Sequence, residues 1–160
     1  MSGEQKGGSV ERVRQALEAH GAAADVVRFD QSTRTAAEAA ATVGCEVGQI
    51  AKSLIFKSKK TGRAVLVIAR GDGRVNEKKI AAAFGEKIGR ADPDFVRATT
   101  GFAIGGVAPV GHTGEVVTFL DEGLGAFEKI WAAAGAPNAV FETTLEELVR
   151  MTGTDPVDVS

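Results

Sequence analysis

The chain has 160 residues, enough for one domain with a full hydrophobic core. Its 44% hydrophobic and 25% charged residues are typical of a soluble globular protein. No apolar run approaches the roughly 20 residues of a membrane helix, and residues 1–9 have no hydrophobic segment of a secretory signal. The single cysteine, Cys45, excludes an internal disulfide and a multi-cysteine metal site. We therefore expect a cytoplasmic protein that binds neither membrane nor metal.

The charge balance argues against a protein that coats nucleic acid, because such binding needs a large excess of Lys and Arg. The chain has 19 Lys and Arg against 21 Asp and Glu, a net charge of −2. One local cluster, Lys52, Lys57, Lys59, Lys60 and Arg63, has two interpretations. It is either a patch that contacts the end of a nucleic acid or a solvated hairpin.

Apolar periodicity and capping residues predict helices and strands that alternate along the chain. Helices are expected over residues 10–20, from a Thr35–Glu38 capping box to Gly44, over 76–84 and 92–99, and after a second capping box at Thr144 and Glu147. Strands are expected over 25–29, 52–57, 64–70, 116–120, 129–134 and 139–142, with helix an open alternative for residues 127–134.

This mixture predicts one α+β domain with a mixed sheet. We expect residues 1–9 to be a disordered N-terminal lead, residues 10–153 to form the domain, and residues 154–160 to be a loose tail.

Lys52 stands out in the strand IAKSLIF because alternation places it on the same face as Ile50, Leu54 and Phe56. Burying an ammonium group costs several kcal/mol unless it finds a partner. Two explanations remain open. The side chain either extends along apolar surface to solvent, or it enters a polar cavity and meets an anionic or carbonyl group of a ligand.

The segment GFAIGGVAPVGHTG, residues 101–114, has five glycines and one proline, and no charged residue lies between Arg97 and Glu115. Glycine allows close approach of the backbone and Pro109 fixes its own φ. The segment is either a buried strand with a tight turn or a shaped loop that presents main-chain groups to a ligand. Together with Lys52, such a loop would suit an oxyanion or a phosphate.

The sequence has no nucleophile elbow, no H-E-x-x-H motif and no dinucleotide fingerprint in the right context. His20 lies at the end of a predicted helix, where an imidazole commonly binds carbonyl groups. His112 lies inside the glycine-rich segment and is the better functional candidate. A single histidine on a loop is nevertheless more often incidental than catalytic.

IAKSLIF, ARGDGRVNEKKIAAAFG and the TTG before GFAIGGVAPVGH together resemble the YbaK/prolyl-tRNA-synthetase-associated domain family. This family comprises stand-alone relatives of the editing domain of bacterial prolyl-tRNA synthetases. The resemblance covers residues 10–153, with the motifs in the right order. It implies a distorted mixed sheet surrounded by helices, no cofactor, and a trans-editing deacylase that hydrolyses the ester of a mischarged tRNA.

The family's lysine matches Lys52, and its G-x-x-x-P loop matches Gly105 to Pro109. The resemblance implies catalytic roles for Lys52, Gly105 and Gly106. The lysine would contact either the phosphate of the 3′-terminal adenosine or the ester region, and amides of residues 105–108 would hold the aminoacyl carbonyl. A ribose hydroxyl would assist the attacking water. The residues expected to bind substrate are Ser53, Val107, Ala108, Pro109 and His112.

Ser53 and His112 depart from the family pattern, and the segment IWAAAGAPNAVF differs from the corresponding turn of the cysteine-specific type. We therefore expect alanine, serine or threonine as the edited residue, with cysteine still open. The expected partner is mischarged tRNA, with an aminoacyl-tRNA synthetase as a further candidate and a monomer or homodimer as the assembly. The alternative is a non-catalytic module that binds a tRNA 3′ end or a synthetase.

Overall fold

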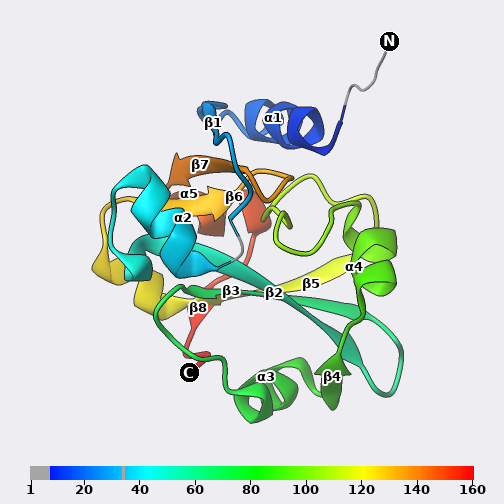
Figure 1. Cartoon of the computed structure of the whole chain (residues 1–160). Helices are drawn as coiled ribbons and strands as arrows, with labels where there is room; N and C mark the ends of the chain where they lie inside the picture. The colour runs from blue at the N-terminus through cyan, green and yellow to red at the C-terminus, as the bar shows by residue number, and fades with distance from the viewer. Residues whose placement is uncertain (1–7, 34) are drawn as a thin grey trace.

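A mixed sheet of eight strands forms the centre of the computed structural model, which describes residues 8–33 and 35–160 (Figure 1). The strand order is β1-β7-β6-β2-β3-β5-β8, and β4 pairs with β2 outside this path. Pairs β2–β6, β3–β5 and β5–β8 are parallel and the others are antiparallel. The strands are β1 (Val26–Arg28), β2 (Ile50–Ser58), β3 (Ala64–Arg70), β4 (Ile88–Arg90), β5 (Val116–Asp121), β6 (Ile130–Ala133), β7 (Ala139–Thr143) and β8 (Pro156–Val157).

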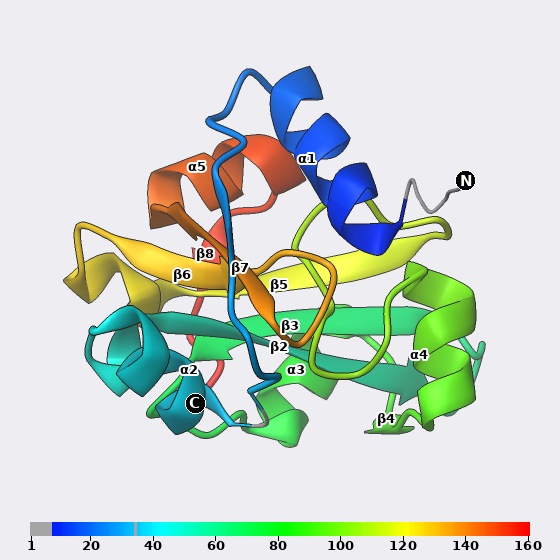
Figure 2. The same ribbon diagram turned by 45° about the horizontal axis from the view of Figure 1, so that its top comes forward.

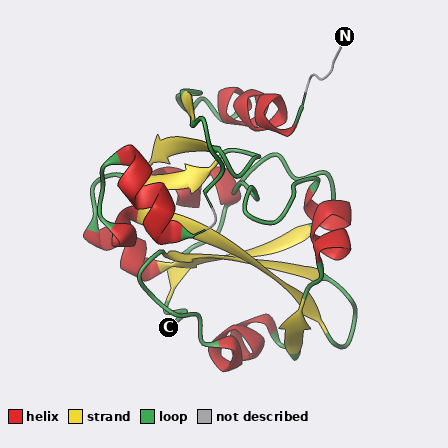
Figure 3. Ribbon diagram, viewed as in Figure 1, coloured by secondary structure: helices red, strands yellow, loops and turns green. Residues whose placement is uncertain are grey.

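Five α-helices and two 3-10 turns accompany the strands in the described part of the chain (Figure 3). They are α1 (Ser9–Ala19), α2 (Ala36–Val43), η1 (Val47–Gln49), α3 (Glu77–Phe84), α4 (Pro93–Thr100), η2 (Glu122–Ala126) and α5 (Leu145–Thr152). The predicted α+β domain with a mixed sheet is confirmed. Residues 130–133 are a strand, which resolves the helix alternative for this segment.

The sheet has a hydrophobic core on each face. Helices α1 and α5 lie on one side of β2, β3 and β5, and α3 lies on the other (Figures 1 and 2). The larger core joins Val13 of α1 and Leu148 of α5 to Leu66 and Ile68 of β3, and the smaller core joins Ile80 of α3 to the opposite face of β3. Both faces of β3 are therefore covered, as its continuous run AVLVIA predicts.

Two capping predictions have different outcomes. Thr35 and Glu38 form the complete capping box at the start of α2, with the side chain of each accepting from the main-chain N–H of the other. Thr144 accepts from the N–H of Glu147, but the Glu147 carboxylate instead receives two hydrogen bonds from Arg150. Only half of the second box is present, because the neighbouring guanidinium holds the carboxylate.

The prediction of a loose C-terminal tail is wrong. Pro156 and Val157 form β8 beside β5. Val159 is 1% exposed in the smaller core, and its carbonyl accepts from the N–H of Asn76. At the other end, residues 1–7 of the predicted disordered lead lie outside the described part, and Ser9 already belongs to α1.

Replacing the buried Val159 of the tail with a smaller residue is expected to destabilise the fold. Val159→Ala should lower the free energy of unfolding by about 1–3 kcal/mol, because it removes two buried methyl groups. Val27→Ala, at an exposed valine of β1, is the matched control and should change it by less than about 0.5 kcal/mol. Urea unfolding measures both. Equal stability of Val159→Ala and the wild type would contradict the docked tail.

Candidate functional site

A cavity of about 540 Å³ lies where the sheet divides. Strand β2 pairs with β6 only at Ile50 and Ala51, and with β4 only from Phe56 onward. No described strand covers this edge of β2 between residues 52 and 55. Lys52 and Ser53 line the cavity there, opposite the segment that joins β6 to β7. Because the sheet divides here, the edge of β2 between residues 52 and 55 faces the cavity instead of a neighbouring strand.

The register shows which main-chain groups face this edge. Ser58 donates its N–H to Arg63 of the β3 side, and Lys59 donates its N–H to Lys87 of the β4 side. Because hydrogen bonding alternates along an antiparallel pair, odd-numbered residues of β2 point their N–H and C=O groups away from β3. Ser53 therefore directs its main-chain groups toward the uncovered edge.

The Ser53 hydroxyl is buried and has no hydrogen-bond partner. Buried hydroxyl groups nearly always have a partner, and one that lacks it is a candidate contact for a ligand. Ser53 lines the cavity, so an oxygen or nitrogen atom of a bound molecule could supply the missing bond. The residue thus offers a side-chain group and two main-chain groups at one place.

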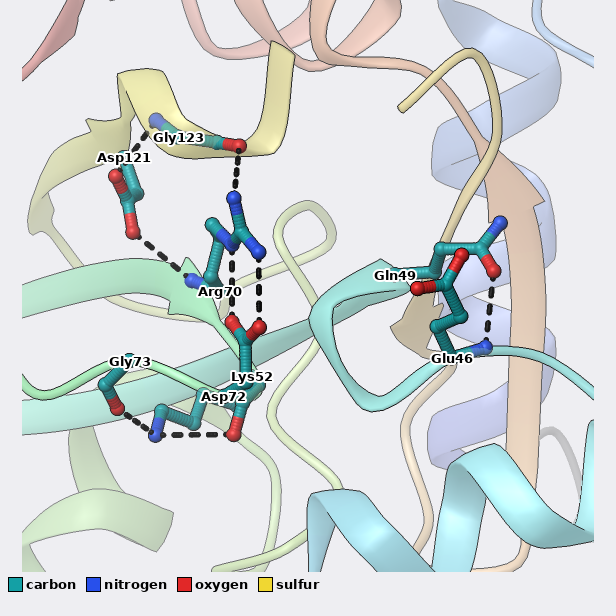
Figure 4. A network of polar contacts seen from close by, with 9 residues as sticks. Glu46, Gln49, Lys52, Arg70, Asp72, Gly73, Asp121 and Gly123 are labelled. Carbon is teal, nitrogen blue, oxygen red and sulfur yellow. Dashed lines mark hydrogen bonds and ion pairs between the residues drawn. The ribbon is translucent and has the colours of Figure 1, made fainter. Parts of the chain in front are cut away.

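Lys52 also lines the cavity, and its ammonium group is held by the turn that follows β3 (Figure 4). It donates to the carbonyl oxygen of Gly73 at 2.6 Å and has a longer contact with that of Gly71 at 3.5 Å. The side chain therefore neither extends freely into solvent nor meets a carboxylate at ion-pair distance. Carbonyl partners leave its positive charge available to an anionic ligand.

Arg70 and Asp72 hold the turn that binds Lys52 (Figure 4). Arg70 makes two hydrogen bonds to the Asp72 carboxylate, at 2.9 and 2.8 Å. These bonds, together with the nearby Lys52 charge, lower the pKa of Asp72. Asp121 accepts from the main-chain N–H of Arg70 and fastens the start of the turn to η2. Residues of the motif ARGDG therefore fix the turn whose carbonyl groups hold the Lys52 ammonium group.

The glycine-rich segment is a loop, and its residues Ile104, Gly105 and Val107 line the cavity. Gly105 has a φ of +90°, which favours glycine, and Gly106 donates its N–H to the carbonyl of Ala103. The N–H groups of Gly105, Val107 and Ala108 make no hydrogen bond to any described residue. Gly105 and Val107 also line the cavity, which makes their N–H groups the candidate donors for a ligand.

The loop packs main chain to main chain against residues 135–138. A Cβ atom added to Gly106 would lie 2.7–2.9 Å from the backbone of Ala136, so only glycine fits there. The Pro137 carbonyl in turn accepts from the main-chain N–H and the hydroxyl of Thr33. Residues 135–138 are therefore held by the glycine-rich loop through Gly106 and by Thr33 through the Pro137 carbonyl.

Arg12 of α1 fixes both ends of the loop from outside the cavity. Its guanidinium donates to the carbonyl of Gly101 at 2.6 Å and to that of Gly111 at 3.0 Å, and it lies over the Phe102 ring. Ser9, the first residue of α1, donates its hydroxyl to the Gly135 carbonyl. Helix α1 is thus a support for the loops of the site.

His112 lies behind the loop and does not line the cavity. Its Nε2 is 2.7 Å from the carbonyl oxygen of Ala108, and its ring meets the edge of Phe102. Burial, reinforced by the nearby Arg12 charge, lowers the pKa of His112 and favours the neutral ring. In this position the imidazole fastens the loop rather than facing a substrate.

Of the predicted site residues, four line the cavity and four do not. Those that line it are Lys52, Ser53, Gly105 and Val107, whereas Gly106, Ala108, Pro109 and His112 lie behind the loop surface. Sequence reasoning missed Arg12, Thr33, Asp72 and Trp131. The only signal for Asp72 was its place in the motif GDGR, and nothing in the sequence connects Arg12 to residues 101 and 111.

The remaining lining is mainly apolar. Ala36 and Ala39 of α2, Ile50 of β2, Trp131 of β6 and Val140 of β7 form this part of the wall. Lys52 is the only ionisable side chain among the lining residues that the structure describes. Over the described ranges, no cluster of His, Cys, Asp and Glu is suited to a metal ion, and no helix is long and apolar enough to span a membrane.

The buried His112 ring predicts a pH dependence of stability. The unfolded chain takes up a proton at this residue near pH 6.5, whereas the lowered pKa delays uptake in the folded state. Stability contributed by His112 is therefore present above that pH and lost as the pH falls toward the folded pKa. Between pH 7.5 and 5.5, the free energy of unfolding should fall more for the wild type than for His112→Gln.

Chemical denaturation at each pH measures this difference. His20→Gln is the matched control, because His20 is exposed and its side chain makes no hydrogen bond to a described residue. It should keep the wild-type dependence on pH. Parallel curves for His112→Gln and the wild type would contradict the role given to the buried ring.

Comparison with known proteins places the chain among editing domains. The family model described as the aminoacyl-tRNA editing domain matches residues 30–151. "Uncharacterized protein YwhH" of Bacillus subtilis is 36% identical over 124 residues, 78% of each chain. "Putative Cys-tRNA(Pro)/Cys-tRNA(Cys) deacylase EbsC" of Enterococcus faecalis is 32% identical, over 74% of this chain and 72% of that protein. Proline–tRNA ligase of Limosilactobacillus fermentum is 34% identical over 56% of this chain, but only 16% of the ligase is covered.

The fold is also shared with solved structures. One is titled "Crystal structure of a putative trans-editing enzyme for prolyl tRNA synthetase"; it is 45% identical, has a TM-score of 0.88, and the match covers 95% of this chain and 96% of that one. The hypothetical protein APE2540 has a TM-score of 0.85 at 32% identity, over 92% and 98% of the two chains. With the family model matching most of its length, this chain belongs to the aminoacyl-tRNA editing domain family.

Proposed function

We propose that the protein is a trans-editing deacylase that hydrolyses the ester bond between a small amino acid and the 3′ end of a mischarged tRNA. One observation carries the proposal: Lys52, Gly105 and Val107 line one cavity, and the N–H groups of Gly105 and Val107 make no hydrogen bond to a described residue. The names of two relatives, a Cys-tRNA deacylase and a trans-editing enzyme, support it. Both names describe activity on the class of substrate that this cavity suits.

The loop supplies electrostatic stabilisation of the reacting carbonyl. During ester hydrolysis the carbonyl oxygen becomes an oxyanion, and fixed N–H donors stabilise that charge more than they stabilise the ground state. In the proposal, Val107 and Gly105, which line the cavity, supply these donors. Gly106 shapes the loop, because its own N–H is already bonded to Ala103.

Lys52 holds the nucleotide side of the ester. Its ammonium group attracts the phosphate of the terminal nucleotide, and exchanging the Gly73 carbonyl for a charged oxygen gives a stronger hydrogen bond. The oxygen of a water molecule attacks the carbonyl carbon, and the bond to the ribose oxygen breaks. A ribose hydroxyl assists removal of the proton from water, the leaving ribose oxygen gains a proton, and the products are the free amino acid and uncharged tRNA.

The apolar wall favours a small, uncharged amino-acid side chain. Alanines at positions 36, 39 and 133 leave space beside Trp131, and the described lining offers no carboxylate to a basic substrate. Alanine, serine and threonine suit this wall, and cysteine is of similar size. A cavity of this kind discriminates poorly between isosteres, by about 1–3 kcal/mol per methylene.

Hydrolysis of a panel of mischarged tRNAs tests the proposal. Ala, Ser, Thr and Cys, each carried by several tRNAs, should show release of the amino acid for at least one combination. A tRNA that binds but keeps every amino acid would contradict the deacylase and support a binding module instead.

Replacing Lys52 is expected to impair catalysis without unfolding the protein. Lys52→Met keeps most of the apolar stem but removes the charge, so kcat/KM should fall about 100-fold, the value of a charge-assisted contact. The free energy of unfolding should change by less than about 1 kcal/mol. Lys78→Met, at an exposed lysine outside the site, should retain wild-type kinetics. An unchanged rate for Lys52→Met would remove the lysine from the mechanism.

Two serines of β2 should respond in opposite ways to replacement by alanine. Ser53→Ala removes a hydroxyl without a partner, so stability should stay equal or rise by up to about 1 kcal/mol while kcat/KM falls about 10-fold. Ser58→Ala breaks hydrogen bonds to Glu86 and to the N–H groups of Lys60 and Thr61. It should cost about 1–3 kcal/mol of stability and leave kcat/KM for 3′-aminoacyl-adenosine unchanged, because Ser58 does not line the cavity.

Denaturation curves and single-turnover hydrolysis measure the two effects. Full activity of Ser53→Ala would show that its hydroxyl does not contact the substrate.

A further inference from the structure

Positive charge is concentrated at one end of the molecule, although the whole chain is slightly acidic. We name this region the positive end and define it as residues 57–63, at the β2–β3 turn, together with residues 86–97, which contain β4 and the first turns of α4. It has seven basic residues (Lys and Arg) and three acidic residues (Asp and Glu). The rest of the chain has twelve basic and eighteen acidic residues. The seven basic residues are Lys57, Lys59, Lys60, Arg63, Lys87, Arg90 and Arg97, and all are exposed.

These segments lie together in space. The turn between β2 and β3, strand β4 and helix α4 occupy the same end of the molecule in both orientations (Figures 1 and 2). Strand β4 pairs with β2 from Phe56 to Ser58, and the pairing continues with the hydrogen bond from Lys59 N–H to the Lys87 carbonyl. Basic residues 28 positions apart in the sequence are therefore neighbours.

The basic side chains of the positive end have no carboxylate partner within ion-pair distance among the described residues. Elsewhere Arg14, Arg70, Lys79, Lys129 and Arg150 each pair with Asp or Glu. The charge of the positive end is therefore not neutralised by its own side-chain pairs.

Two of its three carboxylates are already used within the fold. Glu86 accepts from the hydroxyl groups of Ser58 and Thr61, which lowers the pKa of Glu86 and keeps it ionised. Asp92 caps α4 through the N–H of Phe95. The exposed Asp94 is the third.

Packing holds several of the cations in place. The Lys57 ammonium lies 4.9 Å from the centre of the Phe95 ring, and the Arg63 guanidinium lies 5.2 Å from that of Phe84. The Lys59 stem lies against Gly89, where an added Cβ would approach it to 2.8 Å. Such contacts reduce the entropy that a long side chain loses on binding.

The positive end is connected to the catalytic cavity by one strand. Side chains of odd-numbered residues of β2 share a face, so Lys57 lies on the same face as Ser53, and Lys59 follows directly after the strand. At about 3.3 Å per residue, Lys57 is on the order of 13 Å along β2 from the residue that lines the cavity. A chain of phosphates leaving the cavity along this face would reach these lysines.

We propose that the positive end is a docking surface for the phosphate backbone of the RNA that carries the ester, next to its aminoacylated 3′ end. This inference rests on the proposed function and adds the surface that holds the remote part of the substrate. Apolar anchors typical of a protein interface are missing there, because the large hydrophobic side chains that are exposed in the described residues are Val27 and Ile104. Uncompensated cations without such anchors favour a polyphosphate over an acidic protein.

Salt-dependent binding of uncharged tRNA tests the surface independently of hydrolysis. The test variant is Lys59→Gln with Lys60→Gln and Lys87→Gln, since none of these side chains makes a hydrogen bond or ion pair with a described residue. The matched control is Arg14→Gln with Lys78→Gln and Lys129→Gln, which removes the same number of charges outside the positive end. Fluorescence anisotropy between 50 and 200 mM NaCl gives the dissociation constant and its dependence on salt.

Each phosphate contact contributes about 0.7–0.9 to the slope of log K against log salt. The test variant should therefore lose about 2–3 from this slope and bind tRNA at least ~10-fold more weakly at 50 mM NaCl, while the control stays close to the wild type. Hydrolysis of 3′-aminoacyl-adenosine, which lacks the RNA chain, should be equal in both variants.

Equal slopes for the test and control variants, or no tRNA binding by the wild type at 50 mM NaCl, would overturn the inference. Binding of polyglutamate but not tRNA at the positive end would overturn it in favour of an acidic protein partner. The deacylase proposal can fail separately: a wild type that hydrolyses nothing but shows the predicted difference in slope keeps the RNA surface and loses the catalytic role.

Discussion

The separation of β2 from β6 after Ala51 is the constraint on which the site depends. Up to that residue the two strands are paired, and β4 takes up pairing only at Phe56. Main-chain groups between these points face a cavity instead of a neighbouring strand. Leaving main-chain N–H and C=O groups unpaired in a protein interior costs free energy. These groups of β2 can therefore form hydrogen bonds with a polar ligand in the cavity.

The walls of the cavity are loops, and their positions are fixed by contacts from outside. Arg12 binds carbonyls at both ends of the glycine-rich loop, and Thr33 binds the carbonyl of Pro137. Arg70 and Asp72 hold the turn that carries Lys52. Donors fixed in this way need little reorganisation when charge develops on a substrate, which is the source of electrostatic catalysis.

This arrangement also accounts for a site with no carboxylate or imidazole at the cavity surface of the described residues. An aminoacyl ester is more reactive than an amide, so in the proposed deacylase placement and stabilisation of the oxyanion would supply much of the rate. His112 is buried behind the loop, with a lowered pKa and a bond to Ala108. Its contribution is to the shape of the loop.

The sequence predicted local features well and long-range ones poorly. Apolar alternation and capping residues identified most helices and strands, and the Lys52 strand and the glycine-rich segment do border one cavity. The tail was misjudged because TDPVDVS has little periodicity, and its order comes from pairing with β5 and burial of Val159. The clamp from Arg12 joins residues about 90–100 positions apart, a relation that no local pattern encodes.

The decisive measurement is the structure of the protein bound to alanyl-adenosine in which an amide replaces the ester. We expect the acyl oxygen at about 2.7–3.1 Å from the main-chain nitrogen of Val107 or Gly105. The adenosine should lie toward Lys52 and the methyl group toward Trp131. An acyl group that binds outside the cavity, or one whose oxygen points away from the loop, would show that the loop does not stabilise the oxyanion.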